Sequence, residues 1–96
     1  MVYELDCRYD SRQSFYGKAR VVQKEYDNFI ANTLYSYGTE VASIEYYNNG
    51  LQKYYYNGKY SQTTTRHQKE FFKQNGLSDK EIKELFKNGE LTKMED

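Results

Sequence analysis

The chain has 96 residues, of which twelve are Tyr and five are Phe, and it contains neither Trp nor Pro. Fourteen basic side chains balance fourteen acidic ones, so the formal net charge is zero. This balance excludes a strongly polyanionic DNA mimic and a strongly polycationic nucleic-acid binder. The length suits a single domain over residues 1–96, with a small core that has to include tyrosine rings.

The single cysteine, Cys7, and the single histidine, His67, limit the chemistry of the chain. One cysteine forms no intramolecular disulfide, which excludes a disulfide-stapled secreted scaffold and indicates the cytoplasm as the compartment. A structural zinc site made of His and Cys alone is excluded as well, and we expect no metal and no cofactor. The first ten residues are polar and no window is apolar for 18 residues, so we expect neither a signal peptide nor a membrane span.

The first half of the chain predicts a β-meander behind an irregular arm. Residues 1–16 are polar without a clear period, which indicates an arm with a short strand at Val2–Leu5. Over residues 17–60, runs rich in β-branched and aromatic residues alternate with turn residues, and Asn49-Gly50 is the strongest hairpin signal. The four strands expected there are 18–25, 29–37, 40–47 and 51–56.

Helix signals occupy residues 61–89. Thr65 and Gln68 have the spacing of a capping box, with Thr63 and Thr64 as alternative N-caps, and Gly76 stands where a left-handed residue ends a helix. A second helix follows from a Ser78-x-x-Glu81 capping box to Gly89. We expect residues 90–96 to form a short frayed tail. The predicted fold class is therefore α+β: an antiparallel four-stranded meander followed by two C-terminal helices.

Charge is unevenly distributed along the chain. Residues 51–76 carry five basic side chains and one acidic side chain, a net charge of +4, whereas residues 1–50 and 77–96 each have a net charge of −2. Six of the twelve tyrosines lie between Tyr46 and Tyr60. The neutral total thus contains a basic, tyrosine-rich middle segment.

The candidate binding residues lie where the last predicted strand leads into the first helix. A helix N-terminus with hydroxyl and basic side chains can hold an anion such as phosphate, and strand tyrosines can stack on unpaired bases. The alternative is structural, with one Thr capping the helix and one set of tyrosines packing under the helices as core. The candidates are Tyr54, Tyr56, Lys59, Tyr60, Thr63, Thr64, Arg66 and His67.

The sequence does not support enzymatic activity. His67 has no evident nucleophile or carboxylate beside it in the sequence, and Cys7 stands in a polar arm without a nucleophile motif. The acidic residues lack metal-loop spacing, and the phosphate-loop, dinucleotide-binding and nucleophile-elbow motifs are absent. We therefore expect no catalytic residues and no metal site.

The segment from Asp10 to Ala19 combines turn residues, two aromatic residues and two basic ones. A structural interpretation lays Phe15 or Tyr16 across the sheet edge, with local hydrogen bonds from Asp10 or Ser11. A functional interpretation makes Arg12 and Lys18 partner contacts.

Three motifs of the sequence resemble a widespread small family. They are Tyr9-Asp10-Ser11-Arg12-x-Ser14-Phe15-Tyr16-Gly17-Lys18-Ala19, Ser36-Tyr37-Gly38-Thr39-Glu40-Val41-Ala42 and Tyr60-Ser61-x-Thr63-Thr64-x-Arg66-His67-x-x-Glu70-Phe71-x-x-Gln74-x-Gly76. The family is catalogued as a domain of unknown function and occurs in phages and mobile elements of Gram-positive bacteria. The resemblance runs from about Tyr9 to Leu77. It implies a phage or prophage origin and a cytoplasmic product in the bacterial host, and it brings no established activity.

A small phage protein without catalytic groups is expected to act by binding. We expect a non-enzymatic protein, a counter-defence inhibitor of the anti-CRISPR kind, whose partner is a host protein such as an immune effector nuclease, and the many tyrosines suit interface anchors. One alternative is a nucleic-acid-binding accessory protein that uses the basic, tyrosine-rich segment 51–76. Another is an obligate homo-oligomer in which surplus tyrosines bury against each other.

Overall fold

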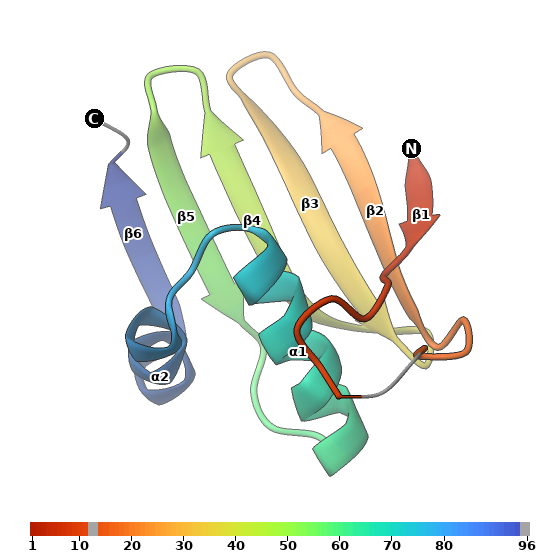
Figure 1. The fold of residues 1–96 in the computed structure, drawn as a ribbon. Helices are drawn as coiled ribbons and strands as arrows, with labels where there is room; N and C mark the ends of the chain where they lie inside the picture. The colour runs from red at the N-terminus through yellow and green to blue at the C-terminus, as the bar shows by residue number, and fades with distance from the viewer. Residues whose placement is uncertain (12–13, 95–96) are drawn as a thin grey trace.

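The computed structural model describes residues 1–11 and 14–94 and shows an α+β fold in which one sheet carries two helices (Figure 1). Among the described residues, six strands form the sheet in chain order, each antiparallel to its neighbours. The elements are β1 Val2–Glu4, β2 Ala19–Glu25, β3 Phe29–Ser36, β4 Thr39–Tyr47, β5 Leu51–Tyr56, α1 Gln62–Gln74, α2 Asp79–Asn88 and β6 Glu90–Met94.

The predicted meander corresponds to β2–β5, and the sheet continues beyond it at both edges. At one edge, β1 pairs with β2, within the short strand predicted at Val2–Leu5. At the other edge, the expectation of a frayed tail is wrong for residues 90–94, because β6 pairs with β5 from Tyr55↔Glu90 to Leu51↔Met94. Gly89, at φ 85°, turns the chain back after α2, and Leu91 then packs against the core. The four-stranded description was therefore too coarse.

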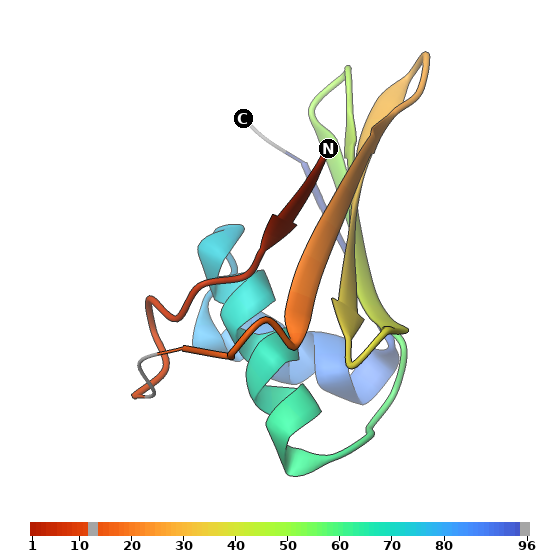
Figure 2. The same cartoon turned by 90° about the vertical axis from the view of Figure 1, so that its right-hand side faces the viewer.

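Alternation along the strands decides which side chains form the core. Both helices pack against one face, where Val21, Leu34, Ile44 and Tyr54 are buried together with Phe71 and Phe72 of α1. Figure 2 shows α1 lying to one side of the sheet. The α2 helix contacts β5 and β6, and it buries Ile82 and Leu85.

No helix in the described part of the chain covers the other face of the sheet, which carries partly exposed aromatic side chains (Figure 2). The carboxylate of Glu45 accepts hydrogen bonds from the hydroxyls of Tyr47 and Tyr55, at 2.8 and 3.1 Å. Burial and this bond to Glu45 raise the pKa of Tyr55 to about 12. Tyr54 and Tyr56 therefore belong to the face that packs on the helices, and Tyr55 belongs to the open face.

The helix ends follow local rules, with one correction. The N-cap of α1 is Ser61, whose Oγ accepts the backbone N–H of Thr64 at 3.1 Å, so the predicted threonine caps lie inside the helix. The capping box of Ser78 and Glu81 at the start of α2 is confirmed. Gly76, at φ 91°, forms the predicted left-handed turn between the helices, and the N–H of Leu77 donates to the carbonyl of Phe72.

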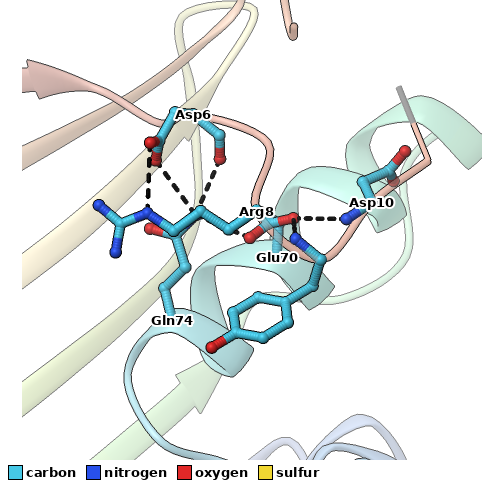
Figure 3. Close-up of polar contacts among 6 residues, drawn as sticks. Asp6, Arg8, Asp10, Glu70 and Gln74 are labelled. Atoms are coloured by element: carbon cyan, nitrogen blue, oxygen red, sulfur yellow. Dashed lines mark hydrogen bonds and ion pairs between the residues drawn. The ribbon is translucent and has the colours of Figure 1, made fainter. Parts of the chain in front are cut away.

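The arm before β2 is irregular in backbone but firmly attached to α1 (Figure 3). Glu70, which is 2% exposed, accepts the backbone N–H groups of Tyr9 and Asp10 through Oε1, both at 2.9 Å. Its Oε2 accepts from Nε2 of Gln74 at 2.7 Å, and Gln74 also donates to the backbone carbonyl of Asp6. Leu5 and Phe15 are buried in the core, so the arm is an integral part of the fold.

Candidate protein-binding groove

Three of the eight predicted site residues are buried. Tyr54 is 1% exposed, and its hydroxyl donates to Oε1 of Gln52 at 2.6 Å. Thr64 and His67 are also buried and face the sheet from α1. A ligand at the surface does not reach these side chains, so we place no ligand contact on them.

His67 belongs to a buried polar cluster that joins α1 to β3. Its Nδ1 lies 2.7 Å from Oγ of Ser36, and the same Oγ lies 2.9 Å from Oγ1 of Thr64. Burial lowers the pKa of His67, and the negative charge of Asp10 partly offsets this effect. The ring also packs edge-on against Phe15, with centroids 4.5 Å apart.

A serine and a histidine at this distance resemble a nucleophile and its base. Ser36 and His67 are only 2% and 1% exposed, so no substrate reaches the serine oxygen in this conformation. We therefore assign the pair a structural role. Ser36 is the partner that sequence reasoning missed, and its signal is a polar residue at an inward-facing position of a strand.

The other five predicted residues are distributed over β5, the loop after it and α1. Tyr56 is half-buried and stacks on Phe86 of α2, with ring centroids 4.1 Å apart. Lys59 and Tyr60 are exposed in the loop before α1, while Thr63 and Arg66 are half-buried on the helix.

The predicted anion site at the α1 N-terminus is occupied by internal hydrogen bonds. Ser61 Oγ donates to Oγ1 of Thr64 at 3.2 Å in addition to capping the helix. Thr65 Oγ1 donates to the carbonyl of Ser61 at 3.1 Å. These hydroxyls stabilise the first turn of α1, and the cap is Ser61 rather than the threonine that the structural alternative expected.

The basic middle segment is divided between the two faces of the sheet. Lys53 lies on the open face, with its Nζ 5.4 Å from the centre of the Tyr47 ring. On the helical side, Arg66 and Lys69 line a small pocket of about 90 Å³ together with Lys73 and residues of the arm. Of the predicted partner contacts in the arm, Lys18 is exposed and Arg12 lies outside the described residues.

A concave feature of the helical side is a groove between α1 and α2. It has a volume of about 520 Å³ and is lined by Lys69, Lys73, Asp79, Lys80, Ile82, Lys83 and Phe86. We call this feature the lysine groove. Ile82 is buried and Phe86 half-buried, so their side chains form an apolar floor inside a rim of charged residues.

The rim of the lysine groove is strongly positive. Four lysines oppose one aspartate, a net charge of +3, and Asp79 is already paired with Lys73, whose Nζ lies 3.2 Å from its Oδ1. Within the described part of the chain, Lys69, Lys80 and Lys83 form no ion pair. Lys69 and Lys73 also line the small pocket beside Arg66, where Asp10 and Glu70 oppose the three basic side chains.

Sequence reasoning missed the α2 half of this groove. Lys80, Lys83 and Phe86 lie in the segment 77–96, whose net charge of −2 does not indicate a positive surface. Their three-residue spacing on a predicted helix is a signal that they share a face. The tight turn at Gly76 then brings that face beside Lys69 and Lys73 of α1.

The groove and its surroundings contain no feature that identifies a cofactor. Among the described residues, no group of three His, Cys, Asp or Glu side chains is placed to hold a metal ion, and no helix is long and apolar enough to cross a membrane.

Comparisons with curated proteins and with solved structures found no significant match. A family model described as a family of unknown function, DUF8033, matches residues 3–88. The chain therefore belongs to the DUF8033 family of unknown function.

Proposed function

We propose that this protein is a non-enzymatic binding protein that holds a partner protein in the lysine groove. The observation that carries this proposal is the combination of an apolar floor, Ile82 and Phe86, with a lysine rim of net charge +3. Apolar surface that is partly accessible inside a polar rim is typical of interaction sites. The open face of the sheet is a weaker candidate, because the hydroxyls of Tyr47 and Tyr55 are already bound to Glu45.

We further propose that the protein comes from a phage or mobile element and that its partner is a host protein. The three motifs between Tyr9 and Gly76 support this origin, because they resemble proteins carried by such elements. In this role the protein acts in the bacterial cytoplasm as a counter-defence inhibitor that occupies a functional surface of an immune effector, such as a CRISPR nuclease. Binding alone suffices for such inhibition and needs no catalytic residue.

Nucleic-acid binding is a second candidate, favoured by the basic side chains Arg66, Lys69 and Lys73 along α1, beside which Asp10 and Glu70 also lie. Phosphate contacts would make such binding strongly dependent on salt. The buried position of Tyr54 removes one of the rings expected to stack on bases. The neutral charge of the whole chain also gives no long-range attraction to a polyanion.

Affinity capture from the bacterial host tests the proposal. The wild-type protein is compared with a groove variant, Lys80→Glu with Lys83→Glu, and with a control variant, Arg20→Glu with Lys24→Glu. All four side chains are exposed, and both variants change the net charge by the same amount, but Arg20 and Lys24 lie on the open face of the sheet. Samples are captured with and without nuclease treatment.

The proposal expects a host protein that the wild-type and control proteins retain after nuclease treatment and that the groove variant loses. Recovery of nucleic acid without a protein supports the second candidate instead. Retention of the same protein by the groove variant, together with its loss by the control variant, places the binding surface on the open face and refutes the role of the groove.

A further inference from the structure

We infer that the occupant of the lysine groove is an acidic amphipathic helix of the partner protein. This inference rests on the proposed binding function and adds the chemistry and conformation of the partner. It follows from three properties of the groove: the elements that line it, the sign of its rim and the nature of its floor.

The lining elements favour a helix over an extended peptide. Every residue that lines the groove lies on α1 or α2, so helix side chains form its wall and no strand edge reaches it. An extended peptide binds best at a free strand edge, where it adds main-chain hydrogen bonds, and the groove offers no such edge. A helix satisfies its own backbone groups and needs only side-chain contacts.

The rim selects acidic side chains on the flanks of that helix. Lys69, Lys80 and Lys83 stand around the groove without an ion-pair partner among the described residues. All three lysines are exposed, so their ammonium groups are accessible to a partner. An incoming Asp or Glu therefore meets an unpaired cation on each side, whereas a basic flank is repelled.

The floor selects apolar side chains along one stripe of the helix. Phe86 is stacked on Tyr56 and lies edge-on to Phe72, with ring centroids 6.3 Å apart, so its ring is held in place before a partner arrives. Together with Ile82 it gives a preformed apolar surface, which lowers the ordering cost of binding. A phosphate backbone would satisfy the lysines but would leave this floor uncovered, so the groove favours an acidic helix over a nucleic acid.

NMR titration of the isotope-labelled protein tests this inference with defined probes. One probe is an amphipathic helical peptide with Leu along one stripe and Glu on both flanks, and the second has Lys in place of every Glu. A single-stranded oligonucleotide of mixed sequence is the third probe. Each is titrated into the wild-type protein, the groove variant (K80E/K83E) and the open-face control variant (R20E/K24E).

The expected result is that the Glu peptide shifts amide signals of α1 and α2, and that the Lys peptide does not. The groove variant should bind the Glu peptide at least about tenfold more weakly, because two attractive charges become repulsive, and the control variant should bind it as the wild type does. The folded state of each variant is checked from the dispersion of its own spectrum.

Three results would overturn the inference. The first is equal binding of the Lys and Glu peptides, and the second is the absence of any amide shift at Glu-peptide concentrations of about 1 mM. The third is an oligonucleotide that shifts the same amide signals and binds more tightly than the Glu peptide. If capture from cells still yields a protein that depends on the groove, only the helix inference fails. If capture yields no protein, the proposed function itself fails.

Discussion

Replacing Glu70 by Gln tests whether this buried carboxylate holds the N-terminal arm on α1. In the wild type, it accepts three hydrogen bonds, from the N–H groups of Tyr9 and Asp10 and from the side chain of Gln74. A Gln side chain has one acceptor oxygen, so it can keep the two backbone bonds only by placing its own amide nitrogen against the donor of Gln74. One hydrogen bond is lost, and the other two are then accepted by a neutral amide oxygen instead of a carboxylate.

The size of the effect follows from these bonds. Hydrogen bonds to charged groups contribute about 1.5–3 kcal/mol each, and neutral ones about 1 kcal/mol, so we expect Glu70→Gln to cost about 2–4 kcal/mol. For a domain of this size, each kcal/mol lowers Tm by about 4–8 °C, so the melting temperature should fall by about 10 °C or more. Thermal unfolding followed by circular dichroism measures this change.

Glu84→Gln provides the matched control, because Glu84 is an exposed carboxylate on α2. Its replacement should change Tm by no more than about 4 °C, because surface substitutions usually change stability by at most about 0.5 kcal/mol. Hydrogen exchange of the Tyr9 and Asp10 amides separates release of the arm from loss of the whole fold. If Glu70→Gln unfolds within about 2 °C of the wild type and both amides stay protected, the carboxylate does not hold the arm.

Three further predictions concern single side chains. Because the pKa of His67 is lowered in the folded state from 6.5, the unfolded chain binds more protons, so stability is lost as pH falls below that value. Urea unfolding of the wild type at several pH values should show a loss of stability of up to about 1.4 kcal/mol per pH unit. His67→Gln should abolish this pH dependence, and the same dependence in the variant would contradict the prediction. Ser78→Ala should cost about 1 kcal/mol through loss of the α2 cap, measured by urea unfolding, and no loss would mean that the cap is redundant. Phe86→Ala should cost about 2 kcal/mol because it removes the stack on Tyr56, and a thermal melt identical to the wild type would refute this packing.

The parts of the fold that could be predicted from the sequence are those set by local residues. The central strands lie within one residue of their expected bounds, because turn residues separate the periodic segments. The second helix also begins and ends as expected, whereas the first begins at the Ser61 cap, two to four residues before the predicted threonine caps. Gly50, Gly76 and Gly89 have φ values of 91°, 91° and 85°, a left-handed conformation that favours glycine. Their positions in the sequence therefore mark the ends of a hairpin strand and of two helices.

The parts that were missed depend on contacts between distant segments. The strand β6 is short, with polar residues Glu90, Thr92 and Lys93 and no strict alternation. It lies against β5 because Gly89 turns the chain back, and Lys93 also pairs with Glu81 at 2.8 Å. No local pattern of residues 90–94 indicates this pairing. Ser36 was not identified as a partner of His67 for the same reason, since the two are 31 positions apart in the chain.

The lysine groove shows why the sign of a binding surface cannot be obtained by adding charges along the chain. The segment 77–96 has a net charge of −2 but supplies Lys80 and Lys83 to the positive rim. One of its carboxylates, Glu81, accepts from Lys93 and from the backbone N–H of Ser78 in the capping box. These two contacts lower the pKa of Glu81, and its charge is paired with Lys93 outside the groove lining. A helix distributes neighbouring side chains around its axis, so acidic and basic residues of one segment reach different surfaces. A neutral total charge therefore excludes a polycationic molecule, and it is fully compatible with one groove whose lining has a net charge of +3.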